Sequence, residues 1–228
     1  MANISRVTDR IWTGGDLPLH LGVDAMLADL EEVRLAGITH VLDNRLEWDD
    51  EEFVETCAPG LTYLWNGEDD IGQRMPDHWF DVGVAFALEA LSEPGTAVLS
   101  HCHMGINRGP SMAFAILLAT GMEPVAALSA IRAARPIAAI SYSGDALRWW
   151  HHATEAPLHV VRRERAQVAA WHRQHPLDVV RIIRRIRDEE RGLSVVPPTV
   201  GGVPEGAPVS TSGSDLVNTR GDARNSAG

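Results

Sequence analysis

The segment 96–121 constrains the fold most, because it joins a buried strand to a buried helix through a short loop. The run TAVLSH is apolar and ends at His101. The run GPSMAFAILLATG has Pro110 in its expected first turn, where proline is tolerated, and closes at Gly121. Apolar residues lie nearly all round this helix, which is typical of a helix enclosed in a core. The segment therefore predicts a layered domain with the loop at one edge of a sheet.

Strand and helix patterns alternate along the rest of residues 1–155. Short aliphatic and aromatic runs next to turn-forming residues are typical of strands, and apolar residues at helical spacing indicate amphipathic helices. The expected strands are 10–15, 38–44, 61–65 and 96–101, and the expected helices are 23–37, 75–91, 109–121, 123–136 and 144–155. This alternation predicts an α/β fold with a central, mostly parallel sheet flanked by helices.

Composition divides the chain into three parts. Residues 1–155 form the expected domain, and residues 156–193 are an arginine-rich helical appendage interrupted at Pro176. Residues 194–228 are rich in Pro, Gly, Ser and Thr, so we expect a disordered tail.

The net charge of −11 is distributed unevenly. Acidic side chains outnumber arginines in residues 1–156, and the reverse holds in residues 157–191. An acidic domain argues against a broad surface for nucleic acid or an anionic membrane. We expect the arginine-rich segment to dock on the acidic domain; a solvated helical face and recruitment of an acidic partner are the alternatives.

Cysteine content and apolar runs indicate the compartment. Cys57 and Cys102 are the two cysteines, no apolar run approaches the ~20 residues that span a bilayer, and MANISRVTDR lacks the features of a signal peptide. We therefore expect a cytoplasmic protein without a membrane span. Cys57 is interpreted as a bystander, with redox pairing to Cys102 as the alternative.

The loop HCHMGINR, residues 101–108, carries the chemistry. His101, Cys102 and His103 are adjacent, so their side chains leave an extended strand in opposite directions, and we expect no metal site. A loop that leads into a helix instead turns successive N–H groups toward one concavity, which binds phosphate and favours a thiolate. Arg108 offers a planar pair of donors for two phosphate oxygens, and Gly105 suits a backbone conformation that other residues avoid.

These letters fit the H-C-x-x-G-x-x-R signature of the cysteine-dependent protein tyrosine phosphatase superfamily, and the domain most resembles its dual-specificity branch. The resemblance covers residues 4 to about 150, from ISRVTDRIWTGG, which resembles the opening strand and glycine turn, through ITHVLDNRLE to AIRAARP. It implies that residues 1–155 are a dual-specificity phosphatase-like catalytic domain that needs neither metal nor cofactor. It also implies that Cys102 is the nucleophile and that His101 orients the loop. The implied phosphate cradle is His103, Met104, Gly105, Ile106, Asn107 and Arg108.

Such phosphatases use an aspartate some thirty residues before the cysteine as general acid. The run NGEDDIGQRMPDHWF offers Asp69 and Asp70, and Asp70 lies 32 positions before Cys102. We expect Asp70 to be the acid, with Asp69 as the alternative.

One position departs from the family pattern. A Ser or Thr ordinarily follows the arginine and stabilises the departing thiolate, whereas this chain has Gly109, with Ser111 two residues later. We therefore expect slow hydrolysis of a phosphocysteine intermediate.

The expected function is hydrolysis of phosphotyrosine, and of phosphoserine or phosphothreonine, in a protein or a small phosphomonoester. The loop carries no Lys or Arg between Cys102 and Arg108, which favours singly phosphorylated substrates. A pseudophosphatase that binds a phosphoprotein is the alternative. A sulfur-transfer or arsenate-reducing enzyme is disfavoured, because neither reaction needs an upstream aspartic acid.

Overall fold

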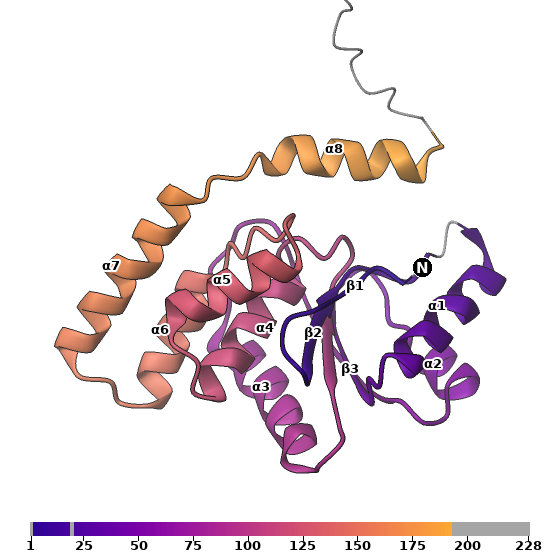
Figure 1. Ribbon diagram of the computed structural model, residues 1–228, viewed down its shortest axis with the longest axis horizontal. Helices are drawn as coiled ribbons and strands as arrows, with labels where there is room; N and C mark the ends of the chain where they lie inside the picture. Colours follow the sequence, from indigo (N-terminus) through magenta and orange to yellow (C-terminus); the bar gives the residue numbers. More distant parts are fainter. Residues whose placement is uncertain (1, 19–20, 193–228) are drawn as a thin grey trace, which may run out of the picture. The chain divides into compact units, whose positions relative to one another are not determined.

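A five-stranded sheet forms the centre of the computed structural model, which describes residues 2–18 and 21–192 (Figure 1). Its strands are β1 (Ile4–Arg6), β2 (Ile11–Gly14), β3 (His40–Arg45), β4 (Thr62–Glu68) and β5 (Val98–His101). Their order is β1-β2-β5-β3-β4; β1 pairs antiparallel with β2, and the remaining pairs are parallel. The expected α/β fold with a mostly parallel sheet is confirmed.

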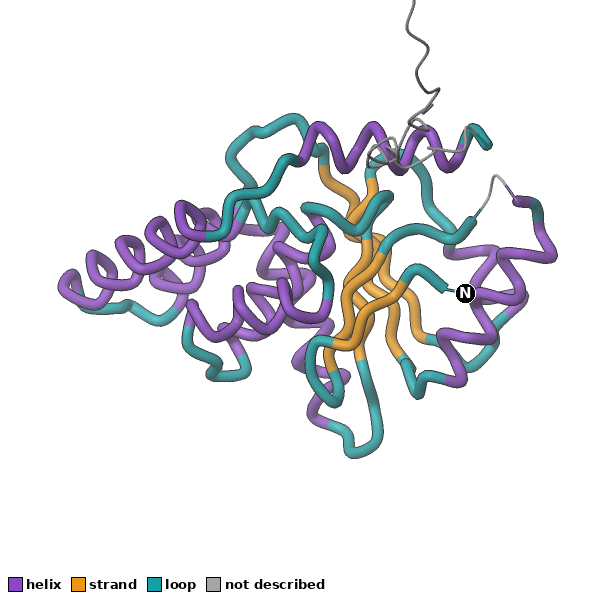
Figure 2. Tube along the Cα trace, turned by 45° about the horizontal axis from the view of Figure 1, so that its top comes forward, coloured by secondary structure: helices purple, strands orange, loops and turns teal. Residues whose placement is uncertain are grey.

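Helices cover both faces of this sheet. They are α1 (Val23–Leu35), α2 (Glu51–Cys57), α3 (Asp77–Ser92), α4 (Arg108–Ala119), α5 (Pro124–Ala134), α6 (Ser143–Ala153), α7 (Leu158–Gln174) and α8 (Val179–Glu190). Figure 2 shows α1 and α2 on one side of the strands and the α3–α6 group on the other. Side chains alternate accordingly: Val41 and Leu99 pack with the first group, and Leu42 and Val98 with the second.

Helix α4 lies at the centre of the larger layer. Every residue from Arg108 to Leu118 is buried, because α3, α5, α6 and the sheet surround the helix. Apolar residues lie all round α4 because the whole helix is enclosed in the core. The loop before α4 is therefore held between two buried elements, β5 and α4.

Two short elements differ from the sequence pattern. The opening segment forms two strands, of which β1 is a three-residue edge strand, and α2 is a helix that the sequence did not predict. Helix α2 has 7 residues and buries only Val54, so its sequence has no repeated apolar spacing by which a helix could be recognised.

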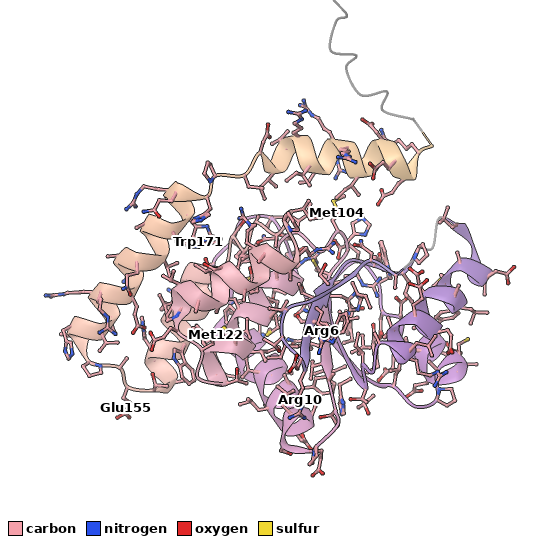
Figure 3. The ribbon with its side chains drawn as sticks, viewed as in Figure 1. Arg6, Arg10, Met104, Met122, Glu155 and Trp171 are labelled. Atoms are coloured by element: carbon pink, nitrogen blue, oxygen red, sulfur yellow. The ribbon has the colours of Figure 1, made fainter. Side chains whose placement is uncertain are left out.

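Helix α7 is attached through apolar contacts rather than through its arginines. Val168 and Trp171 belong to the main core cluster, and Figure 3 shows Trp171 on α7. The Trp171 indole N–H donates to the Ser129 hydroxyl over 3.0 Å. Glu164 adds a buried hydrogen bond, with one of its carboxylate oxygens 2.8 Å from His151 Nε2. We expected the arginines of the appendage to hold it to the acidic domain. Helix α7 instead packs on the domain through apolar side chains.

The C-terminal part of the chain contains helix α8 and the predicted tail. No residue of α8 is buried. The predicted tail, residues 194–228, lies outside the described residues. Across the described helices, none combines the length and apolarity needed to cross a membrane.

Candidate active site

Strand β5 and helix α4 place the loop 101–108 at the carboxyl edge of the sheet. β5 lies between the parallel strands β2 and β3, so its end is fixed on both sides. The Cys102 amide donates to the Gly14 carbonyl over 3.3 Å, and the cysteine is only 2% exposed. Cys102 therefore lies at the base of the loop, just before the N-terminus of α4.

Gly105 and Arg135 fix the shape of the loop. Gly105 has φ 63°, and a Cβ there would lie 2.3 Å from Arg135 Nη2 and 2.5 Å from the Gly14 carbonyl carbon. Arg135 donates to the carbonyls of Gly105 and Met104 over 2.5 and 3.0 Å. With both carbonyls turned outward to the arginine, neighbouring N–H groups are free to face the inside of the loop.

Arg108 folds back over the loop and is 3% exposed. Nη1 and Nη2 donate to the two carboxylate oxygens of Glu47 over 2.8 and 2.6 Å, and Nη1 also donates to the Glu68 carbonyl over 2.7 Å. Burial alone would lower the pKa of Arg108, but its hydrogen bonds to Glu47 and nearby negative charge raise it. The guanidinium is thus a permanent cation whose buried Nε has no hydrogen-bond partner in the described part of the chain.

Asp70 lies beside Arg108. One of its carboxylate oxygens accepts from Asn107 Nδ2 over 2.7 Å and from the Tyr142 hydroxyl over 2.8 Å. The other lies 3.7 Å from Arg108 Nε. Burial and the hydrogen bond to Asp70 raise the pKa of Tyr142 to about 12, so its hydroxyl remains a donor at neutral pH.

These groups line one pocket of about 330 Å³. Its walls include Glu47, Asp70, Cys102, His103, Met104, Ile106, Asn107, Arg108, Ala139 and Ser141. Asp69 is exposed and does not line it. Helix α8 closes one side with Val179, Ile183 and Arg187, and Figure 3 shows Met104 on the side of the domain that faces α8.

The two histidines of the loop contact different carboxylates. His101 Nε2 lies 3.7 Å from Asp43, and burial lowers the pKa of this histidine. His103 Nδ1 lies 3.1 Å from Asp16, and this hydrogen bond raises the pKa of His103. Within residues 2–18 and 21–192, no group of three or more His, Cys, Asp or Glu residues could hold a metal ion.

Gly109 packs against the backbone of the loop. A Cβ at this position would lie 2.8 Å from the His101 carbonyl carbon and 3.0 Å from the Cys102 nitrogen. The Ser111 hydroxyl accepts from the Tyr142 amide over 3.2 Å and lies 3.5 Å from Asn107 Oδ1. The contacts of Ser111 thus join α4 to the segment at residues 141–142.

Glu47 and Tyr142 are site residues that the sequence did not indicate. Glu47 follows β3, whose carboxyl end meets that of β5 at the same sheet edge. That placement was the available signal, since side chains after neighbouring parallel strands lie close together. Tyr142 had no such signal, because it reaches Asp70 from the turn before α6.

No family model matches the chain. It is 33% identical over 114 residues to dual specificity protein phosphatase 26 of Mus musculus, covering 48% of this chain and 50% of that protein. It is 36% identical over 110 residues to dual specificity protein phosphatase 12 of Homo sapiens, covering 46% and 31%. The chain therefore spans about half the length of the first of these relatives and about a third of the second.

Solved structures share the fold. The structure of PTPMT1 in complex with PI(5)P superimposes with a TM-score of 0.54 at 18% identity, covering 67% of this chain and 97% of that one. Human DUSP28 gives a TM-score of 0.52 at 15% identity, covering 68% and 97%. About half of this chain is thus similar in sequence to dual specificity protein phosphatases, and the solved structures show that it shares their fold.

Proposed function

We propose that this protein hydrolyses phosphomonoesters through a phosphocysteine intermediate. One observation carries the proposal: Cys102, Arg108 and Asp70 line the same pocket, which lies at the N-terminus of helix α4. The Arg108 guanidinium is held by Glu47 as a fixed cation in the wall of that pocket. A phosphoryl group fits, because its oxygens accept from a guanidinium in pairs.

The proposed reaction has two steps. The Cys102 thiolate attacks phosphorus, the bond to the leaving oxygen breaks, and that oxygen takes a proton from Asp70. A water molecule then attacks the phosphocysteine, Asp70 takes its proton, and phosphate leaves as the thiolate re-forms. Arg108 and the N–H groups of residues 103–107 hold the charge that develops on the phosphoryl oxygens.

Asp70, rather than Asp69, is our candidate for the acid. Its place in the pocket and its hydrogen bonds to Asn107 and Tyr142 support this choice. These bonds hold the carboxylate near Arg108, where a leaving oxygen would lie.

The proposed substrates carry a single phosphate on tyrosine, serine or threonine, in a protein or a small ester. The loop side chains between Cys102 and Arg108 include no Lys or Arg, which supports this choice. A reducing cytoplasm is the compartment that we propose, since the reaction needs a free thiolate.

A phosphate-binding protein without turnover is the second candidate. Gly109 favours it, because the position lacks a hydroxyl and is too tightly packed for one. A phosphoenzyme that fails to hydrolyse would leave a protein that binds its phosphorylated partner.

Hydrolysis of an aryl phosphate tests the proposal. Wild-type protein, Cys102→Ser, Asp70→Asn and the control Asp69→Asn are compared with and without EDTA. We expect turnover in the wild type and in Asp69→Asn, none in Cys102→Ser, a large loss in Asp70→Asn, and no effect of EDTA. An inactive wild type would refute the proposed hydrolysis, and loss of activity in EDTA would indicate a metal.

A further inference from the structure

A groove of about 680 Å³ adjoins the catalytic pocket. It lies between α5, α6, α7 and the segment 175–178 that joins α7 to α8, and Figure 1 shows these elements side by side. Ala139, Ser141 and Val179 line both the groove and the pocket. A substrate bound at Cys102 could therefore extend directly into the groove.

The groove is basic although the domain is acidic. Its ionisable lining residues are Arg132, Asp145, Arg148, Arg165, His172 and His175. Asp145, the single carboxylate among the described residues of the lining, pairs with Arg148, which also pairs with Asp77 at 2.8 Å. The charges of Arg132 and Arg165 are therefore left without a carboxylate partner in the described parts of the chain.

Arg132 is half-buried and held by neutral groups. Nε donates to the Ala138 carbonyl over 2.8 Å, Nη1 donates to the His175 carbonyl over 3.3 Å, and the guanidinium lies 5.2 Å from the centre of the Trp171 ring. Burial lowers the pKa of Arg132, which is the direction expected for a cation without a counter-charge. An anion in the groove would stabilise it.

Arg165 differs from Arg132 in being exposed. It lies on α7, one residue after the buried Glu164, and lines the groove. Within residues 2–18 and 21–192, no carboxylate forms an ion pair with Arg165. Its guanidinium can therefore bind an anionic ligand without breaking an existing ion pair.

We propose that this groove binds acidic side chains that flank the phosphorylated residue of a protein substrate. The inference rests on the proposed function, since the phosphorylated residue must occupy the catalytic pocket. Continuity with that pocket and the two unbalanced arginines support a peptide occupant, because a small phosphomonoester would fill only the smaller space. Residues 158–179, outside the segment that resembles the phosphatase family, thus help to select the substrate.

Binding of two matched peptides tests the proposal. Each contains one phosphotyrosine and a fluorescein label; one has glutamates on both sides of the phosphotyrosine, and the other has glutamines at the same positions. The full-length Cys102→Ser protein binds them without turnover. We expect the acidic peptide to bind about five- to tenfold more tightly at low salt, and the difference to shrink at about 1 M salt, because exposed pairs are weak and screened.

A variant of the groove assigns the preference to Arg165. In the Cys102→Ser background, Arg165→Gln is expected to remove most of the preference, whereas Arg162→Gln, on the same helix but outside the groove, is expected to retain it. Equal affinities of the two peptides for Cys102→Ser would overturn the proposal. So would equal losses in the Arg165 and Arg162 variants.

Hydrolysis of an aryl phosphate by the wild type separates the two proposals. Turnover without a preference for the acidic peptide refutes the proposed role of the groove but not the proposed hydrolysis. A preference that depends on Arg165, in a protein without turnover, supports the groove and refutes the proposed hydrolysis.

Discussion

Arg108 donates to both carboxylate oxygens of Glu47, over 2.8 and 2.6 Å. This pair fixes the guanidinium by its two terminal nitrogens, so that Arg108 stays in the wall of the pocket. Hydrogen bonds between charged groups contribute about 1.5–3 kcal/mol each. Glu47→Ala is therefore expected to lower kcat/KM for an aryl phosphate at least about tenfold, measured by steady-state kinetics.

Glu51→Ala, which removes an exposed carboxylate from α2, is the control and should leave kcat/KM unchanged. A lower KM and a higher kcat/KM in Glu47→Ala would mean that Glu47 competes with phosphate instead of positioning Arg108.

Gly109 should not tolerate the hydroxyl residue found at this position in the family. Gly109→Ser and Gly109→Ala are both expected to lose about 1–3 kcal/mol of stability, because the added Cβ would overlap the His101 and Cys102 backbone. Thermal unfolding measures this loss, at about 2–4 °C per kcal/mol for a domain of this size. Gly109→Ala separates the steric effect from that of the hydroxyl. An unchanged melting temperature in both variants would contradict the close packing.

The missing hydroxyl also predicts the kinetics. With Gly109 after Arg108, the second step should be slower than the first, so phosphoenzyme accumulates. Rapid-quench measurements with an aryl phosphate are expected to show a burst of the phenol product close to one equivalent per active site. A linear time course from the first turnover would contradict slow phosphoenzyme hydrolysis.

Arg135→Lys should change the backbone conformation of the loop while leaving the Cys102 thiol in place. One ammonium cannot reproduce the fork that meets the Gly105 and Met104 carbonyls. We expect lower affinity for inorganic phosphate, measured as competitive inhibition, and a lower melting temperature. Arg34→Lys, at an exposed position of α1, is the matched control. Equal phosphate affinity in the two variants would show that Arg135 does not shape the cradle.

Glu164, which joins α7 to His151 on α6, should make stability depend on acidic pH. Burial would raise the pKa of Glu164, but hydrogen bonds from His151 and Arg163 outweigh it and lower the pKa below its ordinary 4.5. A carboxylate with a depressed folded-state pKa stabilises the fold above its unfolded pKa, and the contribution is lost as pH falls through the folded value. Melting temperatures below about pH 4.5 should fall more steeply in the wild type than in Glu164→Gln. Parallel curves would contradict this.

The parts of the site that depend on residues close together in the chain could be predicted from the sequence. Cys102, Gly105 and Arg108 lie within seven positions, so the strand and helix around them specify their arrangement. The spacing of Asp70 came from the family resemblance rather than from local physics. Glu47 is harder to find, because its signal is the pairing of β3 with β5, which joins segments far apart in the sequence.

The groove beside the pocket could not be predicted from the sequence for a similar reason. Arg132 and Arg165 lie on α5 and α7, and these helices are brought together by the packing of Val168 and Trp171 into the core. Arginine content predicted a charged surface on the appendage, whereas the position of that surface depends on apolar contacts.

Helix α8 closes one side of the pocket, yet none of its residues is buried. An element with so little buried surface opens locally at low free energy, while α4 is protected until the domain unfolds globally. Amide hydrogens of α8 should therefore exchange orders of magnitude faster than those of α4. A bulky phosphoprotein could then reach Cys102 by displacing one surface helix, while the core that shapes the loop stays intact.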